Sequence, residues 1–446
     1  MLLLSTFLAC NHYEYFNIAG YEQSDYSNKA DILFVIDNSP SMKDESVALG
    51  RSFSSFINLL TSEEGSTEST ENLDDAVDAY VAAITDQGKF IDYQLAITTT
   101  SVDYTNGPST GIDPGEAGLL VGSEPILGKY DPEINRKFRK NLFCESTYWV
   151  TAANDPEAIP VGDESDCDGD GEEVTQAYLN CLCDNNNWTQ TSGAGNEEHL
   201  EAALLAMCRA VPEPPDLCYD PPNTVGPVFQ EGDELSNEGL LRDNSTTVFV
   251  IVSDEGDNST GRVVSNDSDI TPYLDAFAEF DRRIRFAVIG PYYNAEDGDG
   301  SCLSGATSWG VERLQQASRE TQGFYNTLTG SPSESCAPAD FDGHLEDLGT
   351  LLNSLETIFQ LRSVPDVTTI QVYVNGEEVA ESPIRNIEDY EASPSTVTPI
   401  YGDGWSYSSS SNAVVFWGTA VPDYNETVRI YYRPIGGTPR ELPFVY

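Results

Sequence analysis

The chain has 446 residues, of which 39% are hydrophobic and 10% aromatic, a composition that excludes a largely disordered protein. Its 22 basic and 74 acidic side chains leave a formal net charge of −52, which argues against nucleic acid and anionic membrane surfaces as partners. This charge has two explanations, namely attraction of cations or solubility in salty water. The length allows two or three domains with cores of their own.

The chain starts with an apolar run, MLLLSTFLACN, that lacks basic residues and is too short to span a bilayer. It resembles the end of a secretion signal with a bacterial lipobox, in which Ala9 precedes Cys10. Phe7 and Leu8 stand where that motif has leucine and a small residue. The resemblance predicts a lipid on Cys10 and an exported protein of the bacterial cell envelope. The alternative is an ordinary thiol. We interpret residues 1–30 as this signal remnant and a tether.

Nine cysteines are present, so a lipid on Cys10 would leave an even number that could form four disulfides. Disulfides form in oxidising compartments, so they agree with export. The sequence does not determine their pairing, and the candidates are Cys144, Cys167, Cys181, Cys183, Cys208, Cys218, Cys302 and Cys336.

Short apolar runs alternate with amphipathic stretches between residues 31 and 362. Runs of this kind predict strands that are covered on both faces, as in a parallel sheet. Strands that alternate with helices predict a doubly wound α/β domain. The predicted strands are residues 32–36, 93–98, 247–252, 285–290 and 323–328.

Three stretches between these runs have helical periodicity, at residues 46–60, 196–211 and 344–359. In the second stretch, Asn196 is a suitable N-cap, which places Glu197 and Glu198 in the first turn.

Residues 103–195 read as a long irregular insertion that is rich in Gly, Pro, Asp and Asn and holds four of the cysteines. Within it, Asp166, Asp168 and Asp170 have the spacing of the first half of a calcium-binding loop. The twelfth position of that loop is Ala177, which excludes a complete EF-hand. The segment is therefore either a calcium loop completed by a nearby glutamate or a plain acidic loop.

Pro365 marks a boundary, after which the sequence has no helical pattern. The stretch TTIQVYVNGEEVAE predicts two strands joined by a tight turn at Asn375 and Gly376. Two further stretches, GWSYSSSSNAVVFWG and ETVRIYYRP, predict more strands. Residues 366–446 are therefore predicted to form a small all-β sandwich.

Acidic and hydroxyl side chains follow two of the predicted parallel strands. Asp37, Ser39 and Ser41 come after the first apolar run, and Asp254 comes after the run at 247–252. Ligands of open α/β sheets collect beyond the carboxyl ends of the strands. Two buried carboxylates repel one another, and a divalent cation removes that repulsion. Oxygen ligands without histidine or thiolate suit Mg²⁺, Mn²⁺ or Ca²⁺. The alternative is a helix cap.

The stretch Asp37-Asn38-Ser39-Pro40-Ser41 resembles the D-x-S-x-S motif of von Willebrand factor type A (VWA) domains, and Asp254 matches the late aspartate of that family. The resemblance implies a Rossmann-like fold with a metal-ion-dependent adhesion site (MIDAS). In such a site two serines and a threonine bind the metal directly, and the aspartates act mostly through water. A carboxylate from a partner protein fills the remaining position. The chain also resembles bacterial exported lipoproteins that have one VWA domain.

Position 40 departs from the family pattern, and the position of the threonine ligand has more than one candidate. Position 40 is usually glycine, and proline fixes its φ angle and removes an N–H. The threonine ligand is assigned to Thr191, with Ser192 and Thr189 as alternatives. Glu255 and Asp257 are interpreted either as acceptors that orient the ligands or as solvated turn residues.

We therefore predict a lipid-anchored binding protein that holds a protein partner through a divalent cation. The three histidines have neither triad nor metal-ligand spacing, and no phosphate-binding glycine loop is present, so an enzyme is not expected. One alternative is a structural module of a surface assembly, in which the metal stabilises the fold and the β-domain docks. A metal-assisted hydrolase is the less favoured alternative.

Overall fold

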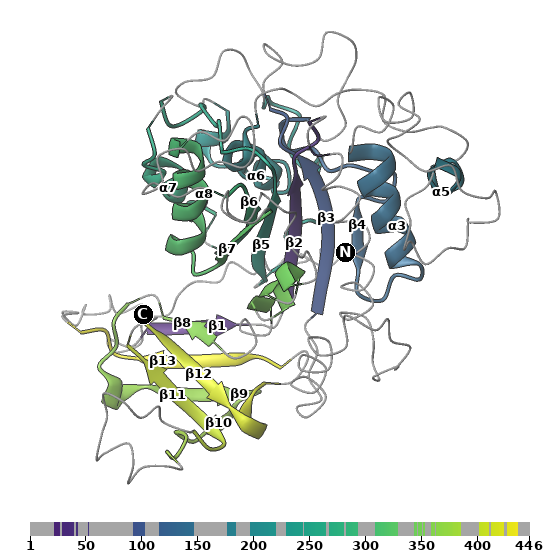
Figure 1. Cartoon of the computed structure of the whole chain (residues 1–446). Helices are drawn as coiled ribbons and strands as arrows, with labels where there is room; N and C mark the ends of the chain where they lie inside the picture. Colours follow the sequence, from purple (N-terminus) through teal and green to yellow (C-terminus); the bar gives the residue numbers. More distant parts are fainter. Residues whose placement is uncertain are drawn as a thin grey trace, which may run out of the picture. The chain divides into compact units, whose positions relative to one another are not determined.

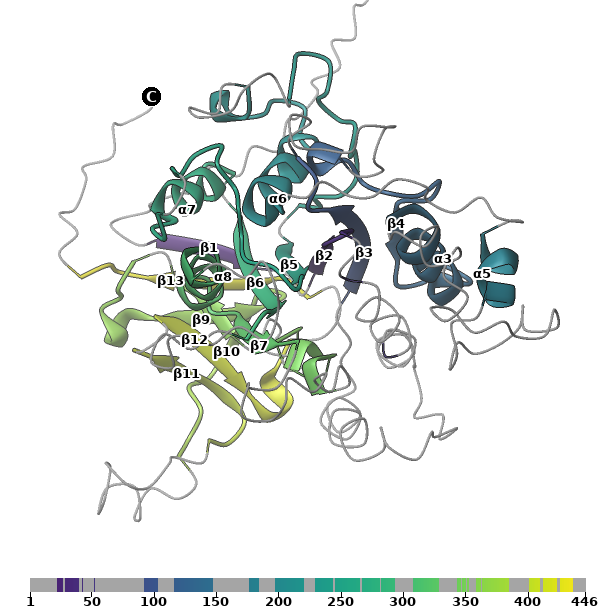
Figure 2. The same cartoon turned by 45° about the horizontal axis from the view of Figure 1, so that its top comes forward.

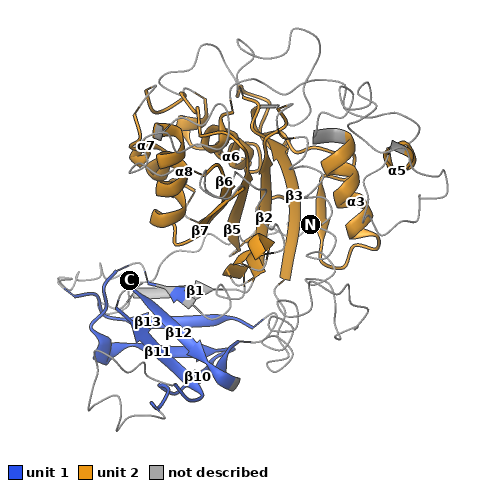
Figure 3. Cartoon of the chain, in the orientation of Figure 1, with its two compact units in different colours: residues 1–27, 355–446 blue, residues 28–354 orange. Residues whose placement is uncertain are grey.

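The computed structural model of the chain divides into two compact units, residues 28–354 and residues 1–27 together with 355–446 (Figures 1 and 3). We call them the α/β unit and the β unit. The structure describes residues 22–26, 29–39, 42, 52, 92–102, 116–146, 176–183, 197–219, 229–243, 245–264, 267–280, 282–292, 308–328, 343–345, 347–349, 351–352, 358–361, 363–384, 401–409, 412–422 and 426–435.

A six-stranded sheet forms the centre of the α/β unit, in the order β4-β3-β2-β5-β6-β7. Its strands are parallel except for β4, which is antiparallel to β3 at one edge. Numbered within this unit, the order is 3-2-1-4-5-6, which is that of a doubly wound Rossmann-like sheet. All five apolar runs lie in strands, and only the run at 323–328 extends beyond its strand, by one residue at each end, so the predicted fold class is confirmed. The bounds are β2 (Lys29–Ile36), β3 (Asp92–Thr99), β4 (Ile126–Gly128), β5 (Thr246–Val252), β6 (Arg283–Gly290) and β7 (Phe324–Thr327).

Helices pack on both faces of this sheet, because successive residues of a strand point to opposite sides. Leu33 and Val35 of β2 belong to an apolar cluster with residues of α6, α7 and α8. Phe34, between them, contacts Phe138 of α3 edge to face, with ring centroids 5.3 Å apart. Figure 2 shows α3 and α6 on either side of β2 and β3. The helices are α3 (Ile134–Lys140), α5 (Gln176–Leu182), α6 (His199–Cys208), α7 (Thr271–Ala278) and α8 (Ser308–Glu320), with short turns η3 (Glu116–Gly118), η4 (Asn141–Ser146) and η6 (Asp216–Cys218).

Helix α6 is buried on all sides. Its position confirms the helix predicted within residues 196–211, but its start differs from the prediction. The helix begins at His199, so Glu197 and Glu198 precede it. Side chains from a distant loop satisfy its first free amides: Asp257 Oδ1 accepts from Leu200 N at 3.1 Å, and Ser259 Oγ accepts from Glu201 N at 3.1 Å.

Part of the predicted irregular insertion belongs to the sheet and its covering layer. Residues 126–128 form edge strand β4, in which Leu127 is buried and pairs with Leu95 of β3. Helix α3 follows and packs on the sheet through Phe138. The prediction of an irregular segment was therefore wrong for residues 116–146, where buried apolar residues such as Leu127 and Phe138 anchor a strand and a helix on the sheet.

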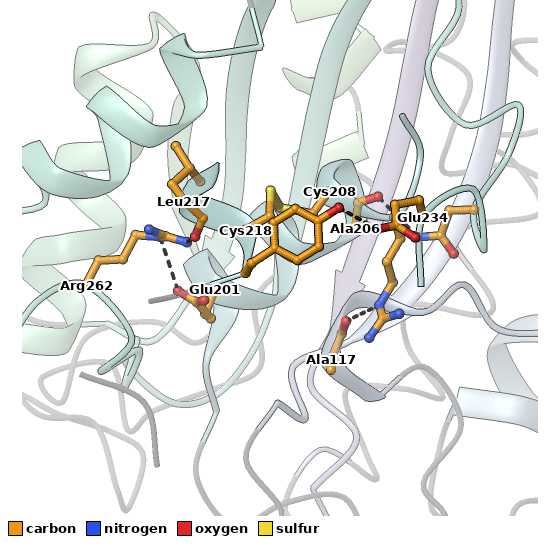
Figure 4. Close-up of a disulfide and its surroundings, with 11 residues drawn as sticks. Ala117, Glu201, Ala206, Cys208, Leu217, Cys218, Glu234 and Arg262 are labelled. Atoms are coloured by element: carbon orange, nitrogen blue, oxygen red, sulfur yellow. Dashed lines mark hydrogen bonds and ion pairs between the residues drawn. A yellow bond between two sulfur atoms is a disulfide. The ribbon is translucent and has the colours of Figure 1, made fainter. Parts of the chain in front are cut away.

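Two disulfides join described residues of the α/β unit. Cys144 bonds Cys183, and Cys208 at the end of α6 bonds Cys218 of η6. The second is supported by Arg262, whose Nη2 donates to the carbonyl of Leu217 at 2.8 Å (Figure 4). Cys181 is also disulfide-bonded. The remaining candidates, Cys167, Cys302 and Cys336, lie outside the described residues.

The β unit is built from two antiparallel sheets, as the sequence predicted. Apolar side chains from both sheets, including Phe359, Val372 and Ile430, form its core. At the predicted turn, Asn375 and Gly376 both have positive φ angles, of 51° and 85°, as a tight hairpin requires. One sheet has the order β1 (Glu22–Tyr26), β13 (Val428–Tyr432), β9 (Gln371–Val374) and β10 (Glu377–Val379). The other has the order β11 (Gly404–Ser408), β12 (Ala413–Trp417) and β8 (Ile358–Gln360). The described part of the unit also has the short turns η8 (Val367–Thr369) and η9 (Gly418–Ala420).

Two strands of the β unit were not predicted. Residues 22–26, within the expected tether, form β1 and pair with β13. Phe359, expected at the end of a helix, lies instead in β8 opposite Val414 of β12. The expected helix at 46–60 lies outside the described residues except for Ser52. None of the described helices combines the length and the apolar character needed to cross a membrane.

Candidate functional site at the carboxyl edge of the sheet

The candidate site lies where β2, β3 and β5 end. Backbone hydrogen bonds continue the sheet by one residue here: Asp37 N donates to the Val252 carbonyl at 3.0 Å, and Thr100 N donates to the Ile36 carbonyl at 3.1 Å. Because β2 and β5 lie on opposite sides of the point where the strand order reverses, this is the crevice in which open α/β sheets bind ligands. The three central strands are seen side by side in Figure 1.

Asp37 is fully buried and held by two hydrogen bonds. Its Oδ1 accepts from Ser39 N at 2.8 Å, and its Oδ2 accepts from Ser253 Oγ at 2.7 Å. The first bond shapes the loop after β2, and the second joins that loop to the end of β5. Ser253 was not predicted as part of the site, although its place between a buried strand and Asp254 was a usable signal.

Asp254 is 4% exposed and lies on the loop next to that of Asp37. Its backbone N donates to Sδ of Met42 at 3.1 Å, so the loops after β2 and β5 are in contact. Gly256 lets this loop approach helix α8, since a Cβ atom there would lie 2.9 Å from the backbone of Gly310. Two acidic loops that are far apart in the sequence therefore meet at one edge of the sheet.

Glu197 is the main site residue that the sequence analysis missed. It precedes α6 and is held through its backbone: its carbonyl accepts from Asn258 N at 2.8 Å, and the next amide, of Glu198, donates to the Thr100 carbonyl at 3.0 Å. Glu197 is 1% exposed, and among the described residues neither of its carboxylate oxygens has a hydrogen-bond partner. Burial, followed by the charges of Asp37, Glu255 and Asp254, raises the pKa of Glu197 to about 10.

Glu255 lies in the same electrostatic environment. Partial burial raises its pKa, the charge of Asp37 raises it further, and His199 lowers it. Its backbone N donates to Ser253 Oγ at 3.0 Å. Ser253 is thus bonded to both Asp37 and the backbone at Glu255, and it links two of the acidic residues of the site.

Asp257 serves the scaffold of the site. Its Oδ2 lies 3.2 Å from Nη1 of Arg313 and its Oδ1 accepts from the first turn of α6. His199 Nδ1 lies 3.7 Å from Oδ1, which is beyond hydrogen-bond distance. Burial alone would raise the pKa of Asp257, but His199, Arg313 and Ser259 together lower it. Asp257 is therefore an anion that fixes the start of α6 next to Glu197.

The acidic and hydroxyl side chains at the site offer oxygen donors, the kind that Mg²⁺, Mn²⁺ and Ca²⁺ prefer. Among the described residues, no three His, Cys, Asp or Glu side chains are placed to hold a metal ion by themselves. A cation would therefore depend on hydroxyl donors as well, of which Ser39 is described and buried. The unpartnered carboxylate of Glu197 beside two further buried acids fits a bound cation. Several predicted residues lie outside the described part of the chain: Cys10, Pro40, Ser41, Asp166, Asp168, Asp170, Thr189, Thr191 and Ser192.

No protein-family profile and no curated protein sequence matches this chain. A VWA protein from Catenulispora acidiphila is 9% identical, with a TM-score of 0.32, over 94% of this chain and 61% of that one. The pilus adhesin SpaC of Lactobacillus rhamnosus GG is 10% identical, with a TM-score of 0.30, over 94% of this chain and 41% of that one. An adhesive tip pilin of Group B Streptococcus agalactiae is 10% identical, with a TM-score of 0.29, over 94% of this chain and 84% of that one.

The alignments thus span less than two thirds of the length of the first two proteins. With the Rossmann-like order 3-2-1-4-5-6, an antiparallel edge strand and the Asp37 motif at the switch point, the α/β unit has a VWA-like fold. A β unit of two antiparallel sheets is added to it.

Proposed function

We propose that this chain is an exported surface protein that binds a protein partner through a divalent cation held at the carboxyl edge of the VWA-like unit. One observation carries the proposal: Asp37 and Asp254 are both buried at the ends of neighbouring parallel strands, with the unpartnered carboxylate of Glu197 in the same electrostatic environment. Like charges without solvent are unfavourable, and a cation is the simplest way to balance them.

The residues that would hold the cation are Asp37, Ser39 and Asp254, together with Ser41 and Thr191 as the VWA resemblance implies. Mg²⁺ is the first choice, with Mn²⁺ or Ca²⁺ as alternatives. The bound cation would supply a positive charge that attracts a carboxylate of the partner. Asp37 is held in place for this role by Ser253 and by the Ser39 amide, and Asp257 and Arg313 position the neighbouring loop.

The burial and pairing of the groups nearest to the site favour a binding role over catalysis. The His199 side chain is fully buried, and Asp257 is paired with Arg313. Neither group is available to exchange a proton with a substrate from solution. Turnover of a substrate by this chain that is lost in the Asp37→Asn variant would contradict this part of the proposal.

The test is thermal unfolding with and without metal. Mg²⁺ or Mn²⁺ is expected to raise the Tm of the wild-type protein, EDTA to reverse the shift, and Asp37→Asn to abolish it. Asp275→Asn is the matched control, since Asp275 is an exposed aspartate of α7 in the same unit. A Tm that does not respond to metal in the wild type would overturn the cation site. Capture of a partner that EDTA does not affect would favour the structural-module alternative.

Export and anchoring are also part of the proposal. The described disulfides support an oxidising compartment. The lipobox-like start supports a lipid on Cys10, and the spacing of Asp166, Asp168 and Asp170 supports a second, calcium-binding loop. Replacing Cys10 with serine is expected to move the protein from the membrane fraction to the soluble fraction. Replacing the three aspartates with asparagine is expected to remove calcium binding that Asp37→Asn leaves intact.

A further inference from the structure

The side chain of Glu197 lacks the contacts that normally accompany a buried carboxylate. Both of its oxygens are buried and have no hydrogen-bond partner in the part of the chain that the structure describes, although its backbone is fixed between Thr100 and Asn258. Burying a polar group without a partner is costly, and such groups are rare in native proteins. Glu201, the third residue of α6, differs in having a partner for one oxygen: its Oε2 accepts from the Tyr273 hydroxyl at 2.8 Å and lies 3.7 Å from Nε of Arg262, whereas its Oε1 has no hydrogen-bond partner among the described residues.

The location of Glu197 indicates what its missing partner is. The described charged groups that act on its carboxylate are Asp37, Glu255 and Asp254, all of them acidic. A positive charge that balanced Asp37 and Asp254 would also be close to Glu197. A protein cation does not fill this role among the described contacts, because Arg313 is paired with Asp257 and bonds to the carbonyls of Ser259, Val264 and Asp267.

We propose that Glu197 is an additional carboxylate ligand of the divalent cation, an inference that rests on the proposed function. In the absence of a partner, Glu197 would occupy a coordination position that water or the partner's carboxylate takes otherwise. It would thus be a ligand from within the chain that competes with the partner.

This role has two consequences of opposite sign. Without metal, replacing Glu197 with glutamine removes a buried carboxylate from beside three other acids and is expected to raise the Tm. With metal, the same change removes a ligand and is expected to weaken Mn²⁺ binding by about tenfold or more. A residue with a purely structural role would not change stability and metal affinity in opposite directions.

The experiment uses the full chain and Mn²⁺ as the probe. Electron paramagnetic resonance gives the Mn²⁺ affinity, and water-proton relaxation gives the number of exchangeable waters on the bound ion. Glu197→Gln is expected to lower the affinity and to add about one water, since a vacated position fills with solvent. Glu201→Gln is the matched control, because it removes a buried carboxylate of α6 that accepts from the Tyr273 hydroxyl, and it is expected to leave both values unchanged.

The outcomes separate the two proposals. If the wild type does not bind Mn²⁺, or if Asp37→Asn binds it equally well, the proposed function fails. If the wild type binds Mn²⁺ and Asp37→Asn does not, but Glu197→Gln matches the wild type in affinity and hydration, only the Glu197 inference is overturned. Should Glu197→Gln fail to fold, Glu197→Asp replaces it, because its shorter side chain is expected to weaken Mn²⁺ binding while it keeps the charge. Wild-type affinity in a folded Glu197→Asp protein would also overturn the inference.

Discussion

The Asp257 carboxylate and the Arg313 guanidinium lie 3.2 Å apart, and both side chains are completely buried. Through this pair, helix α8 holds the loop that carries Asp254, while Asp257 also accepts from the first turn of α6. The pair therefore joins three parts of the scaffold on which the candidate site depends.

Removing one member of this pair is expected to be severe, because it leaves the other charge buried without compensation. We expect Arg313→Ala to lower the free energy of unfolding by about 3–5 kcal/mol, measured by urea denaturation. Arg319→Ala on the same helix is the control. Arg319 pairs with Glu320, but their side chains are 68% and 47% exposed, so little change is expected. Equal losses in the two variants would contradict the structural role given to Arg313.

The protonation of Glu197 predicts a pH dependence of stability in the metal-free protein. Its pKa is raised to about 10 in the folded state, against 4.5 for the ordinary side chain. Between these values the folded protein holds a proton that the unfolded chain has released. The contribution of Glu197 to stability is therefore fully present below the lower value and is lost as the pH rises through the upper one.

We accordingly expect the Tm in EDTA to fall as the pH is raised from about 5 to about 9, and to fall less in Glu197→Gln. The comparison between the two proteins isolates this residue, because the other titratable groups are the same in both. Parallel pH profiles for the two proteins would show that Glu197 is not protonated in the folded state.

The two described disulfides are expected to differ in their contribution to stability. Cys208 and Cys218 are 10 residues apart, and Cys144 and Cys183 are 39 apart. All four are buried, so the packing losses on substitution are similar. In the chain-entropy model, replacing the first pair with alanine costs about 2–3 kcal/mol and replacing the second costs more. Calorimetry of the two double variants tests this order, and a larger loss for the shorter loop would contradict it.

The hairpin turn of the β unit requires a residue that accepts a positive φ angle at position 376. We expect Gly376→Ala to destabilise the β unit by about 1 kcal/mol, although the space around this residue is open. Gly376→Asn should cost less, since asparagine adopts this conformation more readily. Gly128→Ala is the control, because Gly128 also has open space but no positive φ. A neutral Gly376→Ala variant in calorimetry would argue against this turn.

Much of the site scaffold could be predicted from the sequence because the signals are local. The runs that became the ends of β2 and β5 are apolar, so Asp37 and Asp254, which come shortly after them, could be placed at one edge of a parallel sheet. The Asn375-Gly376 turn was predicted for a similar reason, since its backbone conformation depends on the two residues themselves.

Other features depend on partners that are remote in the chain. Glu197 was assigned to a helical turn because it follows a good capping residue, yet Asp257 and Ser259 cap the helix and place its start at His199. Because α6 starts at His199, Glu197 lies before the helix, at the edge of the sheet. Local sequence patterns carry no information about which distant side chain will satisfy a helix end.

The edge strands show the same limit. The polar segment 22–26 has no strand periodicity and becomes β1 because β13 offers it backbone hydrogen bonds. Short strands β4 and β8 likewise form against β3 and β12. The sequence by itself determined the apolar core strands and the acidic residues that follow them, because burial and turn chemistry are encoded in adjacent residues. Only the tertiary structure decided the edge strands, the start of α6 and the inclusion of Glu197, because each depends on hydrogen bonds to residues far away in the sequence.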